Sequence, residues 1–409
     1  MKKGWPVTRL GNLADLVTKG TTPTSIGHSF VEDGINFVKI ESISTTGEFI
    51  NNKFGHITLD CHAVLRRSQL KAGDILFSIA GALGRTAFVT DAILPANTNQ
   101  ALAIIRLKPD DAVFPKFVLK ALETGVVLEQ IEKFKGGVAQ LNLSLVQVRD
   151  LQIALPPLSE QQRIVAILDE AFADLATAKA NAEKNLKNAR ALFESHLNSV
   201  FEQRSEGWVE TTLEKILSSQ PRNGWSPPAA NHSDTGTPVL TLSSVTGFQF
   251  RAEKIKYTSA PTDIRRHYWV NNGDFLITRS NTPELVGHVA IASGIEQPTI
   301  YPDLIMRMNP NPEKMMTEFL YYQLRTPKLR SEITSRAQGA NPTMKKLNKE
   351  AVQTLPICMP PISVQKRAVN TLSSLASETQ RLESLYQRKL AALDELKQSL
   401  LNKAFTGEL

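Results

Sequence analysis

The chain is poor in cysteine and contains no long apolar run. Its two cysteines among 409 residues, Cys61 and Cys358, form neither a disulfide framework nor a spacing that would bind zinc. No apolar stretch approaches the roughly 18 residues that a membrane-spanning helix requires. The opening Met-Lys-Lys-Gly-Trp-Pro lacks the apolar core of a signal peptide. We therefore expect a soluble protein of the cytoplasm that has no membrane partner.

Catalytic motifs are lacking as well. There is no Gly-x-Gly-x-x-Gly segment opening a βαβ unit, and no Walker lysine loop. Pro156-Pro157 and Pro360-Pro361 lack the Asn and the aromatic residue of an amino-methyltransferase tetrad, and the spacing of a restriction-nuclease site is not met. The histidines are scattered without matching acids or cysteines, so no metal site is expected. We predict that the chain is not an enzyme and binds no cofactor or metal by itself.

What the chain does have is an internal repeat, because residues 155–168 return as residues 359–372. The repeated motif comprises Pro156, Pro157, Ser159, Gln161, Arg163, Val165 and Leu168, which recur as Pro360, Pro361, Ser363, Gln365, Arg367, Val369 and Leu372. Further downstream Ser195, Leu197, Asn198 and Phe201 recur as Ser399, Leu401, Asn402 and Phe405. A duplication without a repeated catalytic motif favours a device that holds two similar elements at a set separation.

Two long helices are expected after the motif. Apolar residues recur at a mean step of 3.6 from Ser159 and again from Ser363, which predicts helices of about 40 residues and about 60 Å. We expect each serine to be the N-cap, with Gln162 completing a capping box in the first copy. Gly207 and Gly407 are expected at the C-terminal ends. A helix with one apolar stripe needs a partner, and each helix is the natural partner of the other.

The remaining sequence forms two mixed α/β blocks, here called the first block (residues 1–157) and the second block (residues 207–361). The helical segments are 158–206 and 362–409, and the net charge of +7 comes mainly from the blocks. Each block opens with Gly-Trp, and we expect Trp5 and Trp208 to anchor cores. Each also has a Gly-Asp pair, Gly73-Asp74 or Gly273-Asp274, which we interpret as a turn into a buried strand and not as a phosphate or metal site.

Polar loops that differ between the blocks are the candidate binding sites. Gln and Asn can read adenine, and Lys or Arg can read guanine or phosphate. The candidates are Lys19, Thr22, Arg85, Lys135, Gln140 and Asn142 in the first block, and Arg222, Asn223, Arg265, Arg266, Arg279, Asn281, Arg336, Asn341, Lys345 and Lys346 in the second. Any single residue of this kind is more often a solvated surface group, so the argument rests on the loops as a set.

The Gly-Trp openings, the Gly-Asp strands and the Leu-Pro-Pro-Leu-Ser-Glu-Gln-Gln-Arg-Ile motif together resemble the DNA-specificity subunit of type I restriction–modification enzymes. The second motif departs from the pattern at Val364, Lys366 and Ala368. The resemblance implies two target-recognition domains, each reading half of a bipartite asymmetric site in double-stranded DNA. It also implies that the long helices pack antiparallel as a coiled-coil-like spacer with a pseudo-twofold repeat, and that the helix-start motif docks partners.

The resemblance assigns the chemistry to other subunits. It implies two methyltransferase subunits that use S-adenosylmethionine and two motor–nuclease subunits that use ATP and Mg²⁺. Three alternatives stay open: a specificity subunit of a related system with a fused methyltransferase–nuclease, a helical scaffold that does not bind DNA, and a stand-alone transcription regulator. The last is disfavoured because no short DNA-reading motif is visible.

Overall fold

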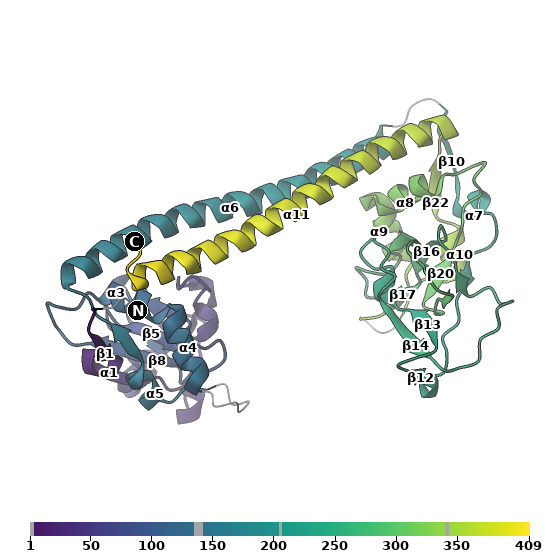
Figure 1. The fold of residues 1–409 in the computed structure, drawn as a ribbon. Helices are drawn as coiled ribbons and strands as arrows, with labels where there is room; N and C mark the ends of the chain where they lie inside the picture. The colour runs from purple at the N-terminus through teal and green to yellow at the C-terminus, as the bar shows by residue number, and fades with distance from the viewer. Residues whose placement is uncertain (1–3, 135–141, 204–206, 340–342) are drawn as a thin grey trace. The chain divides into compact units, whose positions relative to one another are not determined.

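The computed structural model describes residues 4–134, 142–203, 207–339 and 343–409. The chain divides into two compact units. Unit 1 comprises Met1–Glu183 with Arg388–Leu409, and unit 2 comprises Lys184–Gln387. Each unit therefore contains one block together with a part of each long helix (Figure 1).

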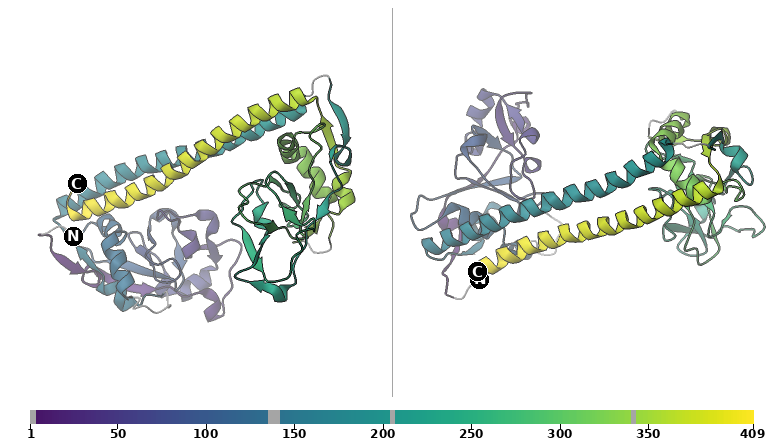
Figure 2. Two further views of the ribbon diagram at one scale, coloured as in Figure 1. Left: turned by 45° about the vertical axis from the view of Figure 1, so that its right-hand side comes forward. Right: turned by 90° about the horizontal axis from the view of Figure 1, so that it is seen from above.

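The long helices are α6 (Leu158–Glu202) and α11 (Ile362–Thr406), each of 45 residues. They run side by side and antiparallel (Figure 2). In unit 1 the Lys179 ammonium lies 2.8 Å from the Asp394 carboxylate, and in unit 2 Arg190 Nε lies 2.8 Å from the Glu383 carboxylate. Such exposed ion pairs define the pairing of the helices more than they stabilise it. Within the described residues, no helix is long and apolar enough to span a membrane.

The two helix ends differ from each other. Gly407 directly follows α11 with a φ of 78°, and Glu408 N donates to Lys403 O at 2.9 Å. The predicted glycine cap is therefore confirmed for this helix. The corresponding prediction is wrong for the first helix, because α6 ends at Glu202 and Gly207 lies too far along the chain to cap it.

The first block packs short helices against small sheets. Its strands are β1 (Val7–Arg9), β2 (Ala14–Lys19), β3 (Ile35–Val38), β4 (Gly55–Ile57), β5 (Ile75–Ser78), β6 (Thr86–Phe88), β7 (Ala96–Thr98), β8 (Leu102–Leu107) and β9 (Gln152–Ala154). Its helices are α1 (Leu10–Leu13), α2 (Leu59–Val64), α3 (Pro115–Leu122), α4 (Gly125–Phe134) and α5 (Leu145–Asp150). The sheets have the orders β2-β8-β5-β6, β4-β3-β7 and β1-β9.

The second block repeats this plan with additions. Its strands are β10 (Val209–Thr212), β11 (Arg222–Asn223), β12 (His232–Ser233), β13 (Thr237–Leu240), β14 (Ile255–Thr258), β15 (Trp269–Val270), β16 (Phe275–Thr278), β17 (Ser280–Asn281), β18 (Val289–Ile291), β19 (Thr299–Ile300), β20 (Ile305–Arg307), β21 (Lys345–Lys346) and β22 (Pro356–Met359). Its helices are α7 (Leu213–Ile216), α8 (Thr317–Arg325), α9 (Pro327–Arg336) and α10 (Lys349–Gln353).

The sheets of the second block correspond to those of the first. Their orders are β11-β20-β16-β18, β12-β14-β13-β19-β15, β10-β22 and β17-β21. Strand β13 pairs parallel with β19, as β3 does with β7. The predicted architecture of two similar mixed α/β blocks and two long antiparallel helices is thereby confirmed.

The Gly-Asp pairs are turns, as predicted. Gly73 and Gly273 have φ of 89° and 93°. Glycine adopts these angles readily, whereas a residue with a side chain would be strained there. The strands that follow, β5 and β16, are buried over their whole length. These turns therefore start the central strands of the two four-stranded sheets.

Each turn carboxylate also makes a buried ion pair that the sequence did not reveal. Asp74 accepts two hydrogen bonds of 2.7 Å from Arg106 in β8. Asp274 accepts one of 3.1 Å from Arg307 in β20. Because the carboxylates are nearly fully buried, each arginine compensates a charge that would otherwise be costly. The pairs tie the turn to the neighbouring strand in both blocks.

The end of each long helix packs on the block of the other repeat. In unit 1 the rings of Phe405 (α11) and Phe117 (α3) lie 4.9 Å apart. In unit 2 the rings of Phe201 (α6) and Phe319 (α8) lie 5.1 Å apart. Each core therefore contains the start of one long helix and the end of the other. The repeated phenylalanines were visible in the sequence, but their exchange between repeats was not.

The tryptophans that open the blocks support these cores, as predicted. Trp5 packs against the core of unit 1. Trp208 lies 6.3 Å from the Phe201 ring and 6.0 Å from the Phe319 ring. Trp208 thus contacts the region where the second block meets the end of α6.

Candidate nucleic-acid interface and helix-start motif

The N-cap of each long helix lies two residues earlier than the serine that the sequence suggested. The Pro157 carbonyl accepts hydrogen bonds from Glu160 N at 2.9 Å and Gln161 N at 3.1 Å. The Pro361 carbonyl accepts the equivalent bonds at 2.9 and 3.0 Å. Because these carbonyls receive the first helical bonds, the second proline of each pair occupies the N-cap position.

The prediction of serine N-caps is therefore wrong, and so is the capping box with Gln162. Ser159 and Ser363 are exposed in the first turn, inside helices that begin at Leu158 and Ile362. A serine caps a helix only from the residue before its first turn.

The repeated glutamine attaches the helix start to the block. Gln161 is fully buried. Its Oε1 accepts from Phe114 N at 2.9 Å, and its Nε2 donates to Ala112 O at 2.9 Å and Pro156 O at 2.7 Å. One side chain thus joins α6 to the segment that leads into α3.

The second repeat has the same arrangement. Gln365 is fully buried, and its Oε1 accepts from Met316 N at 2.8 Å. Its Nε2 donates to Lys314 O at 2.9 Å and Pro360 O at 2.8 Å. The prediction that these glutamines dock partners is wrong, because their hydrogen-bonding atoms are used inside the chain.

The motif consequently has a buried side and an exposed side. Pro156 and Pro360 are buried with the glutamines and are also unsuited to docking. The residues that remain exposed are Pro157, Ser159 and Arg163, with Pro361, Ser363 and Arg367 in the second copy. Arg163 Nε donates to Glu160 at 2.7 Å, and this carboxylate raises the pKa of the Arg163 guanidinium.

Two glycines place the loops after β2 and β11 against neighbouring backbone. A Cβ on Gly20 would lie 1.9 Å from Thr98 O, and a Cβ on Gly224 would lie 1.9 Å from Tyr301 O. Any residue other than glycine would displace the neighbouring backbone at these two positions. The candidates beside these glycines, Lys19 and Asn223, therefore occupy equivalent positions in the two blocks.

In unit 1 several candidates lie near the ends of β5 and β8. Lys19 is exposed, and the Thr22 hydroxyl donates to Gln100 Oε1 at 2.5 Å. Asn142 is exposed and forms an antiparallel bridge with Ala80, just after β5. The candidates Lys135 and Gln140 lie outside the described residues.

Arg85 has a different task from the one predicted. Its Nη1 donates to Ile43 O at 2.7 Å and Ile40 O at 3.3 Å, so it holds that loop against β6. Arg336 in unit 2 is similarly engaged. It forms an ion pair of 2.6 Å with Glu332 and donates to Thr354 Oγ1 at 2.8 Å. We interpret both arginines as internal braces and not as DNA contacts.

One cluster in unit 2 forms where β17 pairs with β21. Asn281 lies opposite Lys345, and Ser280 lies opposite Lys346. Arg279 N and O bond to Leu304 O and Leu347 N, so this arginine precedes the same strand pair. The predicted residues 279, 281, 345 and 346 are therefore brought together. Asn341 lies outside the described residues.

A second cluster surrounds the loop between β14 and β15. The side chains of Arg265 and Arg266 are 88% and 68% exposed, and both guanidinium groups face the Asp263 carboxylate. His267 Nε2 lies 2.9 Å from Asn223 O, which joins this loop to β11 and its exposed Arg222. The strand that carries Arg222 and the loop that carries Arg265 and Arg266 thus meet in the fold, although they are far apart in sequence.

The sequence reasoning missed one exposed residue in this loop. Ile264 is 72% exposed, directly beside the two arginines. The loop that carries it is braced, because Trp269 Nε1 donates to Asp263 O at 2.9 Å. An exposed apolar residue beside two arginines is unusual for a solvated loop and suits contact with nucleic acid.

Groups of His, Cys, Asp and Glu that could hold a metal ion are not found among the residues the structure describes. The candidate residues are amides, hydroxyls and cations. Side chains of these kinds can pair with the phosphates and base edges of a nucleic acid.

Comparison with known proteins agrees with this arrangement. Residues 2–186 and 205–389 each match the family described as the type I restriction modification DNA specificity domain. The chain is 26% identical over 317 residues to the EcoKI type I restriction enzyme specificity subunit of Escherichia coli strain K12, which covers 74% of this chain and 67% of that subunit.

Two solved structures have a similar fold. One, described as the structural basis of complex assembly and conformational transition of the type I R-M system, has a TM-score of 0.79 and 23% identity, covering 100% of this chain and 99% of that chain. The other is the crystal structure of the HsdS subunit from Thermoanaerobacter tengcongensis, with a TM-score of 0.57 and 20% identity, covering 100% and 98%.

The buried glutamine can be tested by replacement. Gln161→Leu should lower the free energy of unfolding by about 3 kcal/mol, because it removes three internal hydrogen bonds and leaves buried backbone groups unpaired. Urea denaturation followed by circular dichroism measures the change. The control is Gln162→Leu at the adjacent exposed position, expected within about 0.5 kcal/mol of the wild type. Equal losses in the two variants would contradict the assignment.

Proposed function

Because this chain belongs to the family of type I restriction modification DNA specificity subunits, we propose that each block reads one half of a bipartite, asymmetric sequence in double-stranded DNA. The supporting observation is that two matching frames carry different side chains at equivalent loop positions. Lys19 corresponds to Asn223, and Asn142 corresponds to Lys346. Equal frames with unequal loops suit two half-sites of different sequence.

In this proposal the two clusters of unit 2 have different roles, one in phosphate contact and one in base recognition. Arg265 and Arg266, which are highly exposed, contact phosphates and supply salt-dependent affinity. Asn281 and Lys346, which lie on paired strands, are better placed to read bases because their backbone is held in register.

The phosphate contacts give the first test. In the complex with its methyltransferase, the chain carrying Arg265→Ala and Arg266→Ala should bind specific and non-specific DNA more weakly. The slope of log K against log salt should fall by about two, one for each lost phosphate contact. Fluorescence anisotropy across a salt series measures both quantities.

The control for this test is Arg381→Ala with Lys389→Ala, which removes two exposed cations from α11. It should leave the slope unchanged. An unchanged slope in the loop variant would contradict the phosphate role, and a wild-type complex without salt-sensitive DNA binding would favour a helical scaffold.

The reactions belong to partner subunits. We propose that two methyltransferase subunits transfer the methyl group of S-adenosylmethionine to adenine, and that two motor–nuclease subunits use ATP and Mg²⁺. A fused methyltransferase–nuclease partner is the alternative. The base to be methylated must leave the helical stack, so this chain positions the duplex while its partner extrudes the adenine.

The exposed side of the helix-start motif is the proposed docking site for the methyltransferase. Charge reversal in Arg163→Glu with Arg367→Glu should reduce co-purification of the methyltransferase at least tenfold, without changing the unfolding midpoint of the isolated chain. Lys133→Glu with Lys349→Glu, which reverses two exposed charges on the blocks, is the matched control. Full co-purification with the motif variant would exclude this docking site.

The antiparallel helices act as a spacer that sets the unread gap between the half-sites. The ion pairs Lys179–Asp394 and Arg190–Glu383 support this, because they give the helices a defined register in both units. If the helices act as a spacer, a change in their length changes the gap and leaves the two half-sites unchanged.

Matched deletions test the spacer. Removing residues 180–186 from α6 and residues 387–393 from α11 takes about 10 Å from each helix, which should shorten the gap by about three base pairs. Methylome sequencing of a host expressing the variant with its methyltransferase reports the gap and both half-sites. Lys179→Ala with Asp394→Ala, which keeps the length, should leave the gap unaltered. An unaltered gap after the deletions would refute the spacer.

A further inference from the structure

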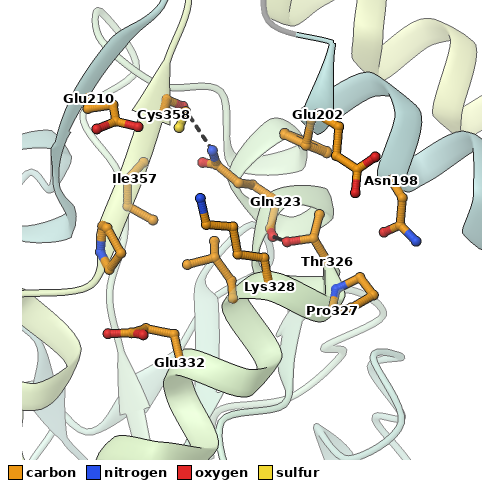
Figure 3. Close-up of a pocket in the computed structure, with 13 residues that line it drawn as sticks. Asn198, Glu202, Glu210, Gln323, Thr326, Pro327, Lys328, Glu332, Ile357 and Cys358 are labelled. Carbon is orange, nitrogen blue, oxygen red and sulfur yellow. Dashed lines mark hydrogen bonds between the residues drawn. The ribbon is translucent and has the colours of Figure 1, made fainter.

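A cavity of about 370 Å³ lies in unit 2 between the end of α6, the start of α9 and strand β22 (Figure 3). The equivalent place in unit 1, between the end of α11, the start of α4 and β9, encloses only about 10 Å³. The two places are built from corresponding residues of the repeat. The difference between them therefore has a local cause.

In unit 1 the space is closed by two sets of hydrogen bonds. Gln130 Oε1 accepts from Gln152 N at 2.8 Å, and Gln130 Nε2 donates to Gln152 O at 3.1 Å. Gly125 N donates to Asn402 Oδ1 at 3.1 Å. Helix α4 is thereby drawn against both β9 and the end of α11.

In unit 2 three replacements remove these donors. Pro327 stands in the place of Gly125 and Pro356 in the place of Gln152, and a proline has no N–H. Glu332 stands in the place of Gln130, and it pairs with Arg336 at 2.6 Å. None of the contacts that close unit 1 can form here, and the cavity stays open.

Two buried acceptors at this cavity have no partner. Asn198, the counterpart of Asn402, has a buried Oδ1 without a hydrogen bond. Gln323, only 3% exposed, also has an unpaired Oε1, while its Nε2 is held by Cys358 O at 3.1 Å. Figure 3 shows both amides among the lining residues. Buried acceptors of this kind select a ligand that donates hydrogen bonds.

The rest of the lining favours a cation with an apolar stem. Glu202, Glu210 and Glu332 contribute carboxylates, of which Glu332 is already paired with Arg336, and Lys328 contributes an ammonium. The carboxylates still outnumber these two cations, so the charge at the lining is negative on balance. Apolar surface comes from Phe201 and its neighbours on α9 and β22.

We propose that this cavity binds a guanidinium or primary alkylammonium group on an apolar stem. The cation lies among the carboxylates, its N–H groups serve the unpaired amide oxygens, and its stem packs on the Phe201 side. The group is either a free small amine or an arginine or lysine side chain of a partner subunit. This site does not depend on the proposed DNA contacts.

Calorimetric titration of the full chain with butylguanidinium tests the site. Saturable binding is expected at one site per chain, and the neutral isostere butylurea should bind at least tenfold more weakly. Glu202→Gln should weaken butylguanidinium at least threefold, and Gln323→Leu at least tenfold. Glu170→Gln, which changes an exposed carboxylate of α6 away from the cavity, should bind like the wild type.

A closing variant adds an independent test. Pro327→Gly with Glu332→Gln and Pro356→Gln installs the donors of unit 1, so it should abolish butylguanidinium binding while raising the thermal midpoint. Binding by this variant equal to the wild type would overturn the proposal. So would the absence of saturable binding to the wild type, or equal binding of butylurea.

The source of the cation is distinguished by competition. If a partner side chain is the occupant, saturating butylguanidinium should raise the apparent dissociation constant of the methyltransferase subunit severalfold. An unchanged constant together with saturable binding assigns the cavity to a free amine.

Discussion

Each long helix depends on one buried side chain for its attachment. The amides of Gln161 and Gln365 use both oxygen and nitrogen, and they bond to three separate points of the backbone. A planar amide held at three points fixes the position of the helix start and its rotation about its own axis. These two attachments therefore fix how each block meets the long helix that follows it.

The long helices could be predicted because a mean step of 3.6 between apolar residues indicates a helix from the local sequence alone. Their first residue could not. Two prolines before a serine leave two candidate caps, and the choice depends on the Pro157 and Pro361 carbonyls. The role of Gln161 was equally hidden, since a repeated polar residue suits a docking surface as well as an internal bond. The hydrogen bond from Phe114 N to Gln161 Oε1, which only the fold reveals, distinguishes the two roles.

The polar loops that differ between the blocks could be located from the sequence, but the contacts of their individual side chains could not. Arg85 and Arg336 look like DNA contacts in the sequence, yet their partners are groups such as Ile43 O and Thr354 Oγ1. Arg85 meets a carbonyl 42 residues away, which no local pattern reveals. Conversely, Asn281 and Lys345 pair through two strands of only two residues each. Strands this short show no periodicity from which they could be predicted.

The exchange of helix ends also governs when the protein can fold. The Gly125–Asn402 hydrogen bond joins residues 277 positions apart, and Phe117 finds its ring partner in Phe405. On a ribosome that elongates at about 5–20 residues per second, the first block is finished many seconds before the helix that completes its core. Its apolar face stays uncovered throughout that interval. The first core can therefore be completed only after the last residues of the chain have been synthesised.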